Sequence, residues 1–209
     1  MRSTGSKKLF EYWSRLKGTR LAPERSEIEP SDIRELLGDT FILEINSTMK
    51  TICFRLAGTR LCSIYGRELK GYGYLGLWDE AHNLTTIRCI NKAYMDYTAS
   101  LISHKGKTAS GRTVSFETLL LPLLPTSSDS ARVLGICSVV EKPPFWLGSE
   151  PIVSNTIVKV RELPGVEVPS QTTTMAPDLE HLDLIGSSTD QPAMRQRGHL
   201  TVIDGGRND

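Results

Sequence analysis

The sequence has no hydrophobic run long enough to span a membrane. No apolar stretch approaches the ~18 residues that such a helix needs, and the N-terminal residues MRSTGSKKLFEYW lack the apolar region of a signal peptide. The formal net charge is only +1, which gives no reason to expect a nucleic acid or an acidic surface as partner. We therefore expect a cytoplasmic protein that binds neither membranes nor nucleic acids.

Cysteines are few, and none is paired at the short spacing that a zinc site uses. The four are Cys53, Cys62, Cys89 and Cys137, and no two of them form a CxxC motif. The sequence also offers no nucleophile accompanied by a matching base and an orienting group. It therefore predicts neither a metal site nor an enzyme.

Charge is unevenly divided along the chain. Residues 164–209 carry three basic and seven acidic residues, a net charge of −4, which leaves +5 on the rest. Ser, Thr, Pro, Gln and Asp dominate this part, and the apolar periodicity seen elsewhere disappears. Such a composition cannot bury enough apolar area to offset the entropy of ordering, so we expect residues 164–209 to be a disordered tail.

Before the tail, apolar periodicity predicts an α+β domain. Residues 6–17 read as an amphipathic helix, with Phe10 and Trp13 on its apolar stripe and Gly18 as its C-terminal cap. Two aromatic residues on so short a helix need cover from another element. A second, longer helix starts near Asp79, with an apolar stripe from Leu84 to Tyr97. Alternating apolar residues predict five strands, over residues 40–46, from 51 to the break at Gly58, 98–105, 113–121 and 131–140.

Two stretches of this pattern are specific. Residues 51–71, TICFRLAGTRLCSIYGRELKG, read as a strand, a glycine break and two short helical turns, each ended by a glycine. Residues 111–123, GRTVSFETLLLPL, form a GR-x-V-x-x-E-x-LLLPL signature. Together with the order of the elements, these marks resemble a compact bacterial family of single PAS domains over roughly residues 6–140.

The resemblance implies a PAS-like five-stranded antiparallel sheet with helices packed on one face. It divides the chain into an N-terminal helix and linker (1–25), a PAS-like domain (26–145), a flanking segment (146–163) and the polar tail (164–209). Within the flanking segment, residues 152–160 form an amphipathic stretch that could return to the domain.

The function implied by the resemblance is a sensory or protein-interaction module in signal transduction, without catalysis. It would work by a ligand- or partner-dependent conformational shift, with a small apolar ligand held between the sheet and the longer helix. The residues expected to line that site are Phe54, Arg60, Ile64, Leu69, Trp78, Ile87, Tyr94 and Phe116. Helices that flank PAS domains pair across two-fold axes, so a homodimer is expected through Phe10, Tyr12 and Trp13. An unidentified signalling protein would be a further partner.

Three alternatives stay open. The first is a structural adaptor whose core is filled and which binds a partner protein at an exposed edge. The second is nucleotide binding at residues 71–76, GYGYLG, a literal GxGxxG that lacks the preceding buried strand of a dinucleotide site. The third is haem binding through His82, near the start of the longer helix. His104, next to Lys105 at a strand end, is expected to be solvated.

Overall fold

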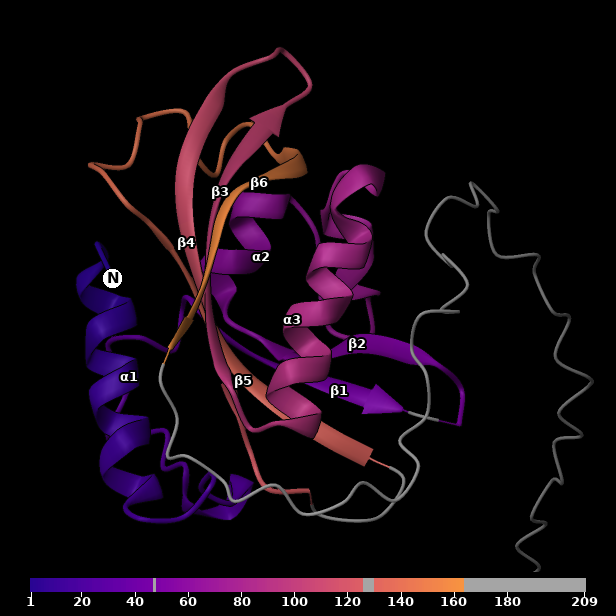
Figure 1. Ribbon diagram of the computed structural model, residues 1–209. Coiled ribbons are helices and arrows are strands. Elements are labelled where there is room, and N and C mark those ends of the chain that lie inside the picture. Colours follow the sequence, from indigo (N-terminus) through magenta and orange to yellow (C-terminus); the bar gives the residue numbers. More distant parts are fainter. Residues whose placement is uncertain (47, 126–129, 164–209) are drawn as a thin grey trace, which may run out of the picture.

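A single antiparallel sheet organises the protein (Figure 1). The computed structural model describes residues 1–46, 48–125 and 130–163; the expected disordered tail lies outside them. In these residues the strand order is β2-β1-β5-β4-β3-β6, and every neighbouring pair is antiparallel. The strands are β1 (Thr40–Asn46), β2 (Thr51–Ala57), β3 (Ala99–Thr108), β4 (Thr113–Pro122), β5 (Ser130–Val139) and β6 (Ile152–Leu163). The sheet therefore has six strands rather than the five expected from the sequence.

Helices cover both faces of the sheet. They are α1 (Thr4–Lys17), α2 (Thr59–Tyr65) and α3 (Asn83–Met95), with short 3-10 turns η1 (Arg25–Glu27), η2 (Tyr74–Leu77) and η3 (Glu80–His82). Helices α2 and α3 lie on one face, here called the inner face, and α1 lies on the opposite, outer face (Figure 1). Within the described residues, no helix has both the length and the hydrophobicity that crossing a bilayer requires.

Two separate cores result from the alternation of side chains along each strand. On β4, Phe116 and Leu120 point to the inner core, whereas Leu119 and Leu121 point to the outer core. A strand that is buried on both faces reads as a nearly continuous apolar run. This is why the signature stretch LLLPL carries so little alternation.

Helix α1 is anchored on the outer face at its N-terminal end. At its start, the Ser3 hydroxyl accepts hydrogen bonds from the backbone N–H groups of Gly5 and Ser6. The buried carboxylate of Glu117 accepts from the backbone N–H groups of Arg2, at 2.9 Å, and Ser3, at 3.2 Å. A carboxylate at this position also interacts favourably with the positive end of the helix dipole. The glutamate of the sequence signature therefore holds the first turn of α1 to the sheet.

The aromatic residues of α1 are covered by the chain itself. Tyr12 and Trp13 are buried in the outer core, and the Trp13 indole donates a 2.8 Å hydrogen bond to the carbonyl of Pro122. Phe10 is half-buried and stacks on Trp13, with the ring centroids 6.0 Å apart. Burial of each such side chain is worth ~1.5–3 kcal/mol, and a single chain already supplies it. Their need for cover therefore gives no reason to expect a dimer, and dimerisation through these three residues stays a prediction.

The sixth strand escapes sequence-based recognition because β-bulges interrupt its pattern. β6 pairs with β3 over its whole length, but the register shifts twice and leaves Val153 and Val158 as extra residues. Both valines are exposed, at 56% and 63%. Each bulge changes the phase of the alternation, so residues 152–163 show no uninterrupted period of two.

The buried face of α3 differs from the expected stripe. Leu84 is 57% exposed and Tyr97 lies beyond the end of the helix, with a positive φ of 50°. Ile87 and Ile90 of the expected stripe are buried as predicted, and the other buried residues of the helix are Asn83, Thr86, Cys89 and Ala93. The two faces differ by only about one residue in phase, and the smaller side chains Thr86, Cys89 and Ala93 bring the helix close to the sheet.

Two glycines let aromatic rings lie flat against the inner face. Gly135 on β5 is the direct partner of Phe41 on β1, and a Cβ atom on Gly135 would come within 2.2 Å of the Phe41 ring. Gly106 on β3 is paired with Val114 on β4, and a Cβ atom on Gly106 would come within 2.7 Å of the ring of Phe116, two residues further along that strand. The missing side chains are thus replaced by rings from neighbouring strands.

We predict that Gly135→Ala destabilises the fold by ~1–3 kcal/mol, because Phe41 must move within a packed core. Urea unfolding measures the change. The matched control is Gly38→Ala, where the added atom would meet Arg60 Cβ at the ordinary contact distance of 3.4 Å. Equal unfolding midpoints for the two variants would contradict the prediction.

Candidate functional site

An unbroken row of six rings crosses the inner face of the sheet. Its members come from β1, β2, η2 with its C-terminal cap, β3 and β4. In order, these rings, here called the aromatic row, are Phe41, Phe54, Tyr74, Trp78, His104 and Phe116. Successive ring centroids lie 5.5, 5.4, 5.9, 4.9 and 5.3 Å apart. The row therefore joins four strands of the sheet to η2 and its C-terminal cap.

His104 is the polar centre of the row. It is buried, 2% exposed, between the rings of Trp78 and Phe116. Its Nδ1 lies 3.0 Å from Asn155 Oδ1, and its Nε2 lies 2.8 Å from Thr118 Oγ1. The expectation that His104 is solvated is wrong, because β3 continues to Thr108 and His104 shares the inward-facing side of that strand with Ile102.

Asn155 connects the edge strand β6 to the helical layer. It is fully buried, and its Nδ2 lies 3.0 Å from the Tyr65 hydroxyl and 2.6 Å from the carbonyl of Leu77. Its backbone carbonyl accepts a hydrogen bond from the N–H of Asp79. One side chain thus joins β6 to α2 and η2. His104, Asn155, Thr118, Tyr65 and the nearby Cys137 are here called the polar network.

The contacts of Asn155 determine which ring nitrogen of His104 carries the proton. The carbonyl of Leu77 can only accept, so Nδ2 is the donor there and Oδ1 is the acceptor toward His104. His104 Nδ1 therefore carries the proton, and Nε2 accepts from the hydroxyl of Thr118. Burial lowers the pKa of His104 to about 3. The imidazole is neutral, and both of its nitrogens are occupied.

Two donors beside this network have no partner. Within the described residues, the Tyr74 hydroxyl and the Trp78 indole N–H are buried and make no hydrogen bond. The indole lies near the Tyr74 hydroxyl and tends to lower its pKa, but without hydrogen-bond geometry. Burial raises the pKa of Tyr74 well above its ordinary value, so the phenol stays protonated. An unsatisfied buried donor costs ~1–3 kcal/mol, which makes these two groups a candidate binding point.

The structure brings together most of the residues expected to line a site. Six lie buried in the inner core, namely Phe54, Ile64, Leu69, Trp78, Ile87 and Phe116, and Tyr94 is half-buried against it. Arg60 does not join them. Its exposed guanidinium pairs with Asp39 on the surface, so it cannot orient a ligand in the core.

The residues that sequence reasoning missed are polar or come from irregular segments. Tyr65 and Tyr74 lie in the stretches that were recognised, but nothing in the sequence distinguishes them from ordinary core residues. Asn155 follows a bulge, and its partners His104 and Tyr65 are 51 and 90 residues away. The one usable signal is parity, because His104 is two residues from the apolar Ile102 on the same strand.

The glycine-rich residues 71–76 do not form a phosphate-binding loop. The Gly71 N–H bonds to the carbonyl of Phe54, and the Phe54 N–H bonds to the carbonyl of Tyr72, so the segment extends the pairing of edge strand β2. The next element along the chain is the four-residue turn η2, not a helix. In the described chain, no group of three or more His, Cys, Asp or Glu could hold a metal ion. Haem binding through His82 stays a prediction.

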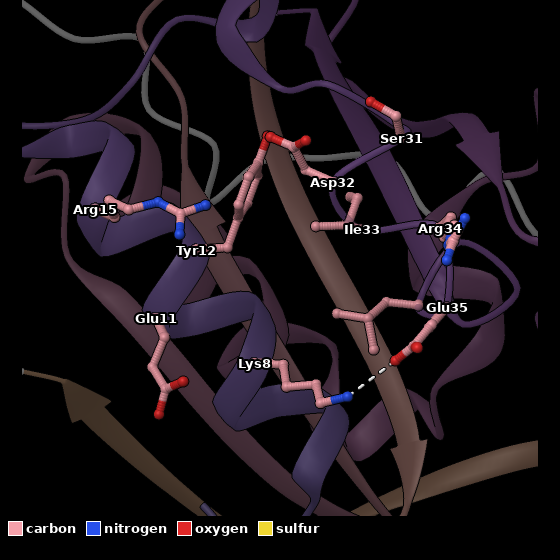
Figure 2. A pocket seen from close by; sticks show the side chains of 10 residues that line it. Lys8, Glu11, Tyr12, Arg15, Ser31, Asp32, Ile33, Arg34 and Glu35 are labelled. Atoms are coloured by element: carbon pink, nitrogen blue, oxygen red, sulfur yellow. Dashed lines mark hydrogen bonds and ion pairs between the residues drawn. The ribbon is translucent and has the colours of Figure 1, made fainter.

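A surface pocket of about 510 Å³ lies between α1 and residues 31–36 (Figure 2). Its lining contains three cations, Lys8, Arg15 and Arg34, and three carboxylates, Glu11, Asp32 and Glu35, so the charges balance. Lys8 bridges to Glu35 at 2.9 Å. The Tyr12 hydroxyl in its wall already accepts a hydrogen bond from the N–H of Glu29. None of the buried unpaired polar atoms lies on a residue that lines this pocket, so the inner core remains the candidate site.

The chain is similar to one protein-family model and to several solved structures. A family model described as a PAS domain matches residues 1–138. Among solved structures, a light-oxygen-voltage domain studied with a flavin analogue is 10% identical, with a TM-score of 0.42, and the match covers 54% of this chain and 84% of that one. The Rhodobacter sphaeroides light-oxygen-voltage protein is 11% identical, with a TM-score of 0.40 and coverages of 57% and 73%. A PAS domain from Colwellia psychrerythraea is 14% identical, with a TM-score of 0.37 and coverages of 55% and 100%. None of the curated proteins matches the chain.

The buried, neutral His104 predicts a pH dependence of stability. In the folded protein its pKa is lowered from 6.5 to about 3, so below pH 6.5 the unfolded chain binds a proton that the folded chain does not. The contribution of this group is complete above pH 6.5 and is lost, at about 1.4 kcal/mol per pH unit, as the pH falls from 6.5 toward 3.

His104→Gln should therefore reduce the fall in unfolding free energy between pH 7 and pH 5 by about 2 kcal/mol. Urea unfolding at the two pH values measures this fall. His82→Gln is the matched control, because the His82 ring makes no hydrogen bond within the described residues. Parallel pH profiles for wild type and His104→Gln would show that the imidazole is not buried as described.

Proposed function

The chain belongs to the PAS domain family, and from this we propose that it is a non-catalytic sensory module in signal transduction whose ligand binds where the aromatic row meets the polar network. The observation that supports this site is the pair of unpaired donors, Tyr74 OH and Trp78 Nε1. Both lie beside residues that already hydrogen-bond one another. A ligand with one acceptor atom and an apolar body would satisfy them both.

The proposed signal is a shift in how β6 sits against the helical layer. Asn155 spans that junction through Tyr65 and the carbonyl of Leu77. A ligand that accepts from Tyr74 or Trp78 stabilises one arrangement of η2, and η2 carries one of the two Asn155 contacts. The ligand then changes the populations of the two arrangements by as much as its affinities for them differ. Output passes by protein contact to a second copy or to a signalling protein.

The chemistry of the core supports binding rather than catalysis. Both nitrogens of His104 are committed, and burial holds its pKa near 3, far too low for a general base at neutral pH. Burial raises the pKa of the neighbouring Cys137 to about 12, which keeps it as an unreactive thiol. The proposal therefore includes no reaction.

A second candidate is the adaptor with a filled core. It is favoured by the two rings that occupy glycine positions, Phe41 over Gly135 and Phe116 over Gly106. In this case the unpaired donors are a permanent cost, and the inner core has no ligand. The two candidates predict opposite effects for removal of the Tyr74 hydroxyl.

We expect freshly purified protein to retain a small molecule in native mass spectrometry. Tyr74→Phe should lower the retained fraction about tenfold, because one hydrogen bond worth about 1.4 kcal/mol is lost. The control is Tyr72→Phe, whose hydroxyl makes only a long, exposed contact of 3.5 Å to the carbonyl of Gly76. That variant should retain the molecule as wild type does.

The adaptor predicts no retained molecule, and it predicts that Tyr74→Phe is stabilised by about 1 kcal/mol because an unsatisfied hydroxyl is removed. Thermal melts of the same proteins measure this. A stabilised Tyr74→Phe variant together with an empty wild type would refute the sensor.

A further inference from the structure

The outer face of the sheet carries four cations on two neighbouring strands. Lys105 and Lys107 lie on β3, and Lys159 and Arg161 lie on β6, all exposed. The register places them on one face, since Lys159 is opposite Ser103 and Arg161 is opposite the outer-core residue Leu101. We call these four residues the basic patch.

The described part of the chain does not neutralise the basic patch. None of the four cations forms an ion pair in residues 1–46, 48–125 or 130–163. The cross-strand partners of Lys105 are the neutral Ser115 and Thr156. Two carboxylates on these or neighbouring strands are already engaged: Glu162, next to Arg161 on β6, pairs with Lys92 of α3, and Glu117 on β4 holds the start of α1.

An unpartnered face of like charge repels itself and attracts an acidic segment. The chain contains such a segment after β6: residues 164–209 have a net charge of −4, and three of their carboxylates, Asp178, Glu180 and Asp183, fall within six residues. β6 ends at Leu163, two residues after Arg161 of the basic patch. The fourteen residues from 164 to 177 could extend to about 46 Å, more than enough to turn back along β6.

We propose that residues 178–183 dock on the basic patch of the same chain. The occupant is chosen by charge and by position, because the acidic stretch is tethered directly to β6, the strand that carries half of the patch. Tethering raises its effective concentration to the millimolar range, so weak ion pairs suffice. An external acidic partner would have to compete with this segment for the four cations.

The proposal is tested on the full chain by zero-length carbodiimide coupling, which joins lysine amines to carboxylates that are in contact. Mass spectrometry of a mixture of ¹⁴N- and ¹⁵N-labelled protein separates links within one copy from links between copies. We expect Lys105, Lys107 and Lys159 to be joined to Asp178, Glu180 or Asp183 of the same copy. The yield should fall at least about fivefold in 1 M salt, where the screening length is ~3 Å instead of ~10 Å at 0.1 M.

The variant Lys107→Gln/Arg161→Gln weakens the patch while leaving Lys105 and Lys159 available for coupling. Its yield at these two lysines should also fall at least about threefold, because half of the patch charge is gone. The matched control, Lys70→Gln/Arg88→Gln, removes two exposed cations elsewhere and should leave the yield unchanged. Links that form only between copies, links spread evenly over all surface lysines, no links, or an equal yield in the patch variant would each overturn the proposal.

Discussion

The buried carboxamide of Asn155 is the interaction on which the inner half of the structure depends. It uses its oxygen and both of its amide hydrogens, toward His104, Tyr65 and the carbonyl of Leu77. These contacts hold together the edge strand, the central sheet and the helical layer. In a low-dielectric core a fully satisfied polar network specifies one arrangement, whereas a partly satisfied one is costly. The hydrogen bonds of Asn155 are complete, whereas the Tyr74 hydroxyl and the Trp78 indole N–H beside the polar network have no partner within the described residues. These two donors are the reason to look for a ligand in the inner core.

The two faces of the sheet share backbone but differ in role. On β4, Glu117 points outward to hold α1, and the next residue, Thr118, points inward to His104. On β5, Cys137 and Ser138 alternate in the same way. A movement of β4 and β5 would therefore displace both the side chains of the polar network and the Glu117 carboxylate that holds α1.

The sequence predicted those parts whose apolar period is regular. Five strands, the N-terminal helix and most of the residues of the inner core were found in this way, because each follows from local alternation or from helical spacing. β6 was missed since two bulges shift its phase, and Asn155 with it. The neighbouring Lys105 suggested a solvated His104, although its parity with Ile102 indicated burial. The position of Arg60 was predicted wrongly because a charged residue next to a turn does not indicate which way its side chain points. Its partner Asp39 is 21 residues away in the sequence.

The β-bulges in β6 also affect how two molecules of this protein can associate. An edge strand of 12 residues is normally a template on which a second sheet can grow. Here Val153 and Val158 interrupt the ladder, and in an antiparallel pairing of two copies centred on Val160, Lys159 would face Arg161 of the other copy. β6 can therefore pair with β3 along its length, whereas its bulges and its charges disfavour pairing with a strand of another molecule. Bulges and charges of this kind are features by which edge strands avoid pairing with a second sheet.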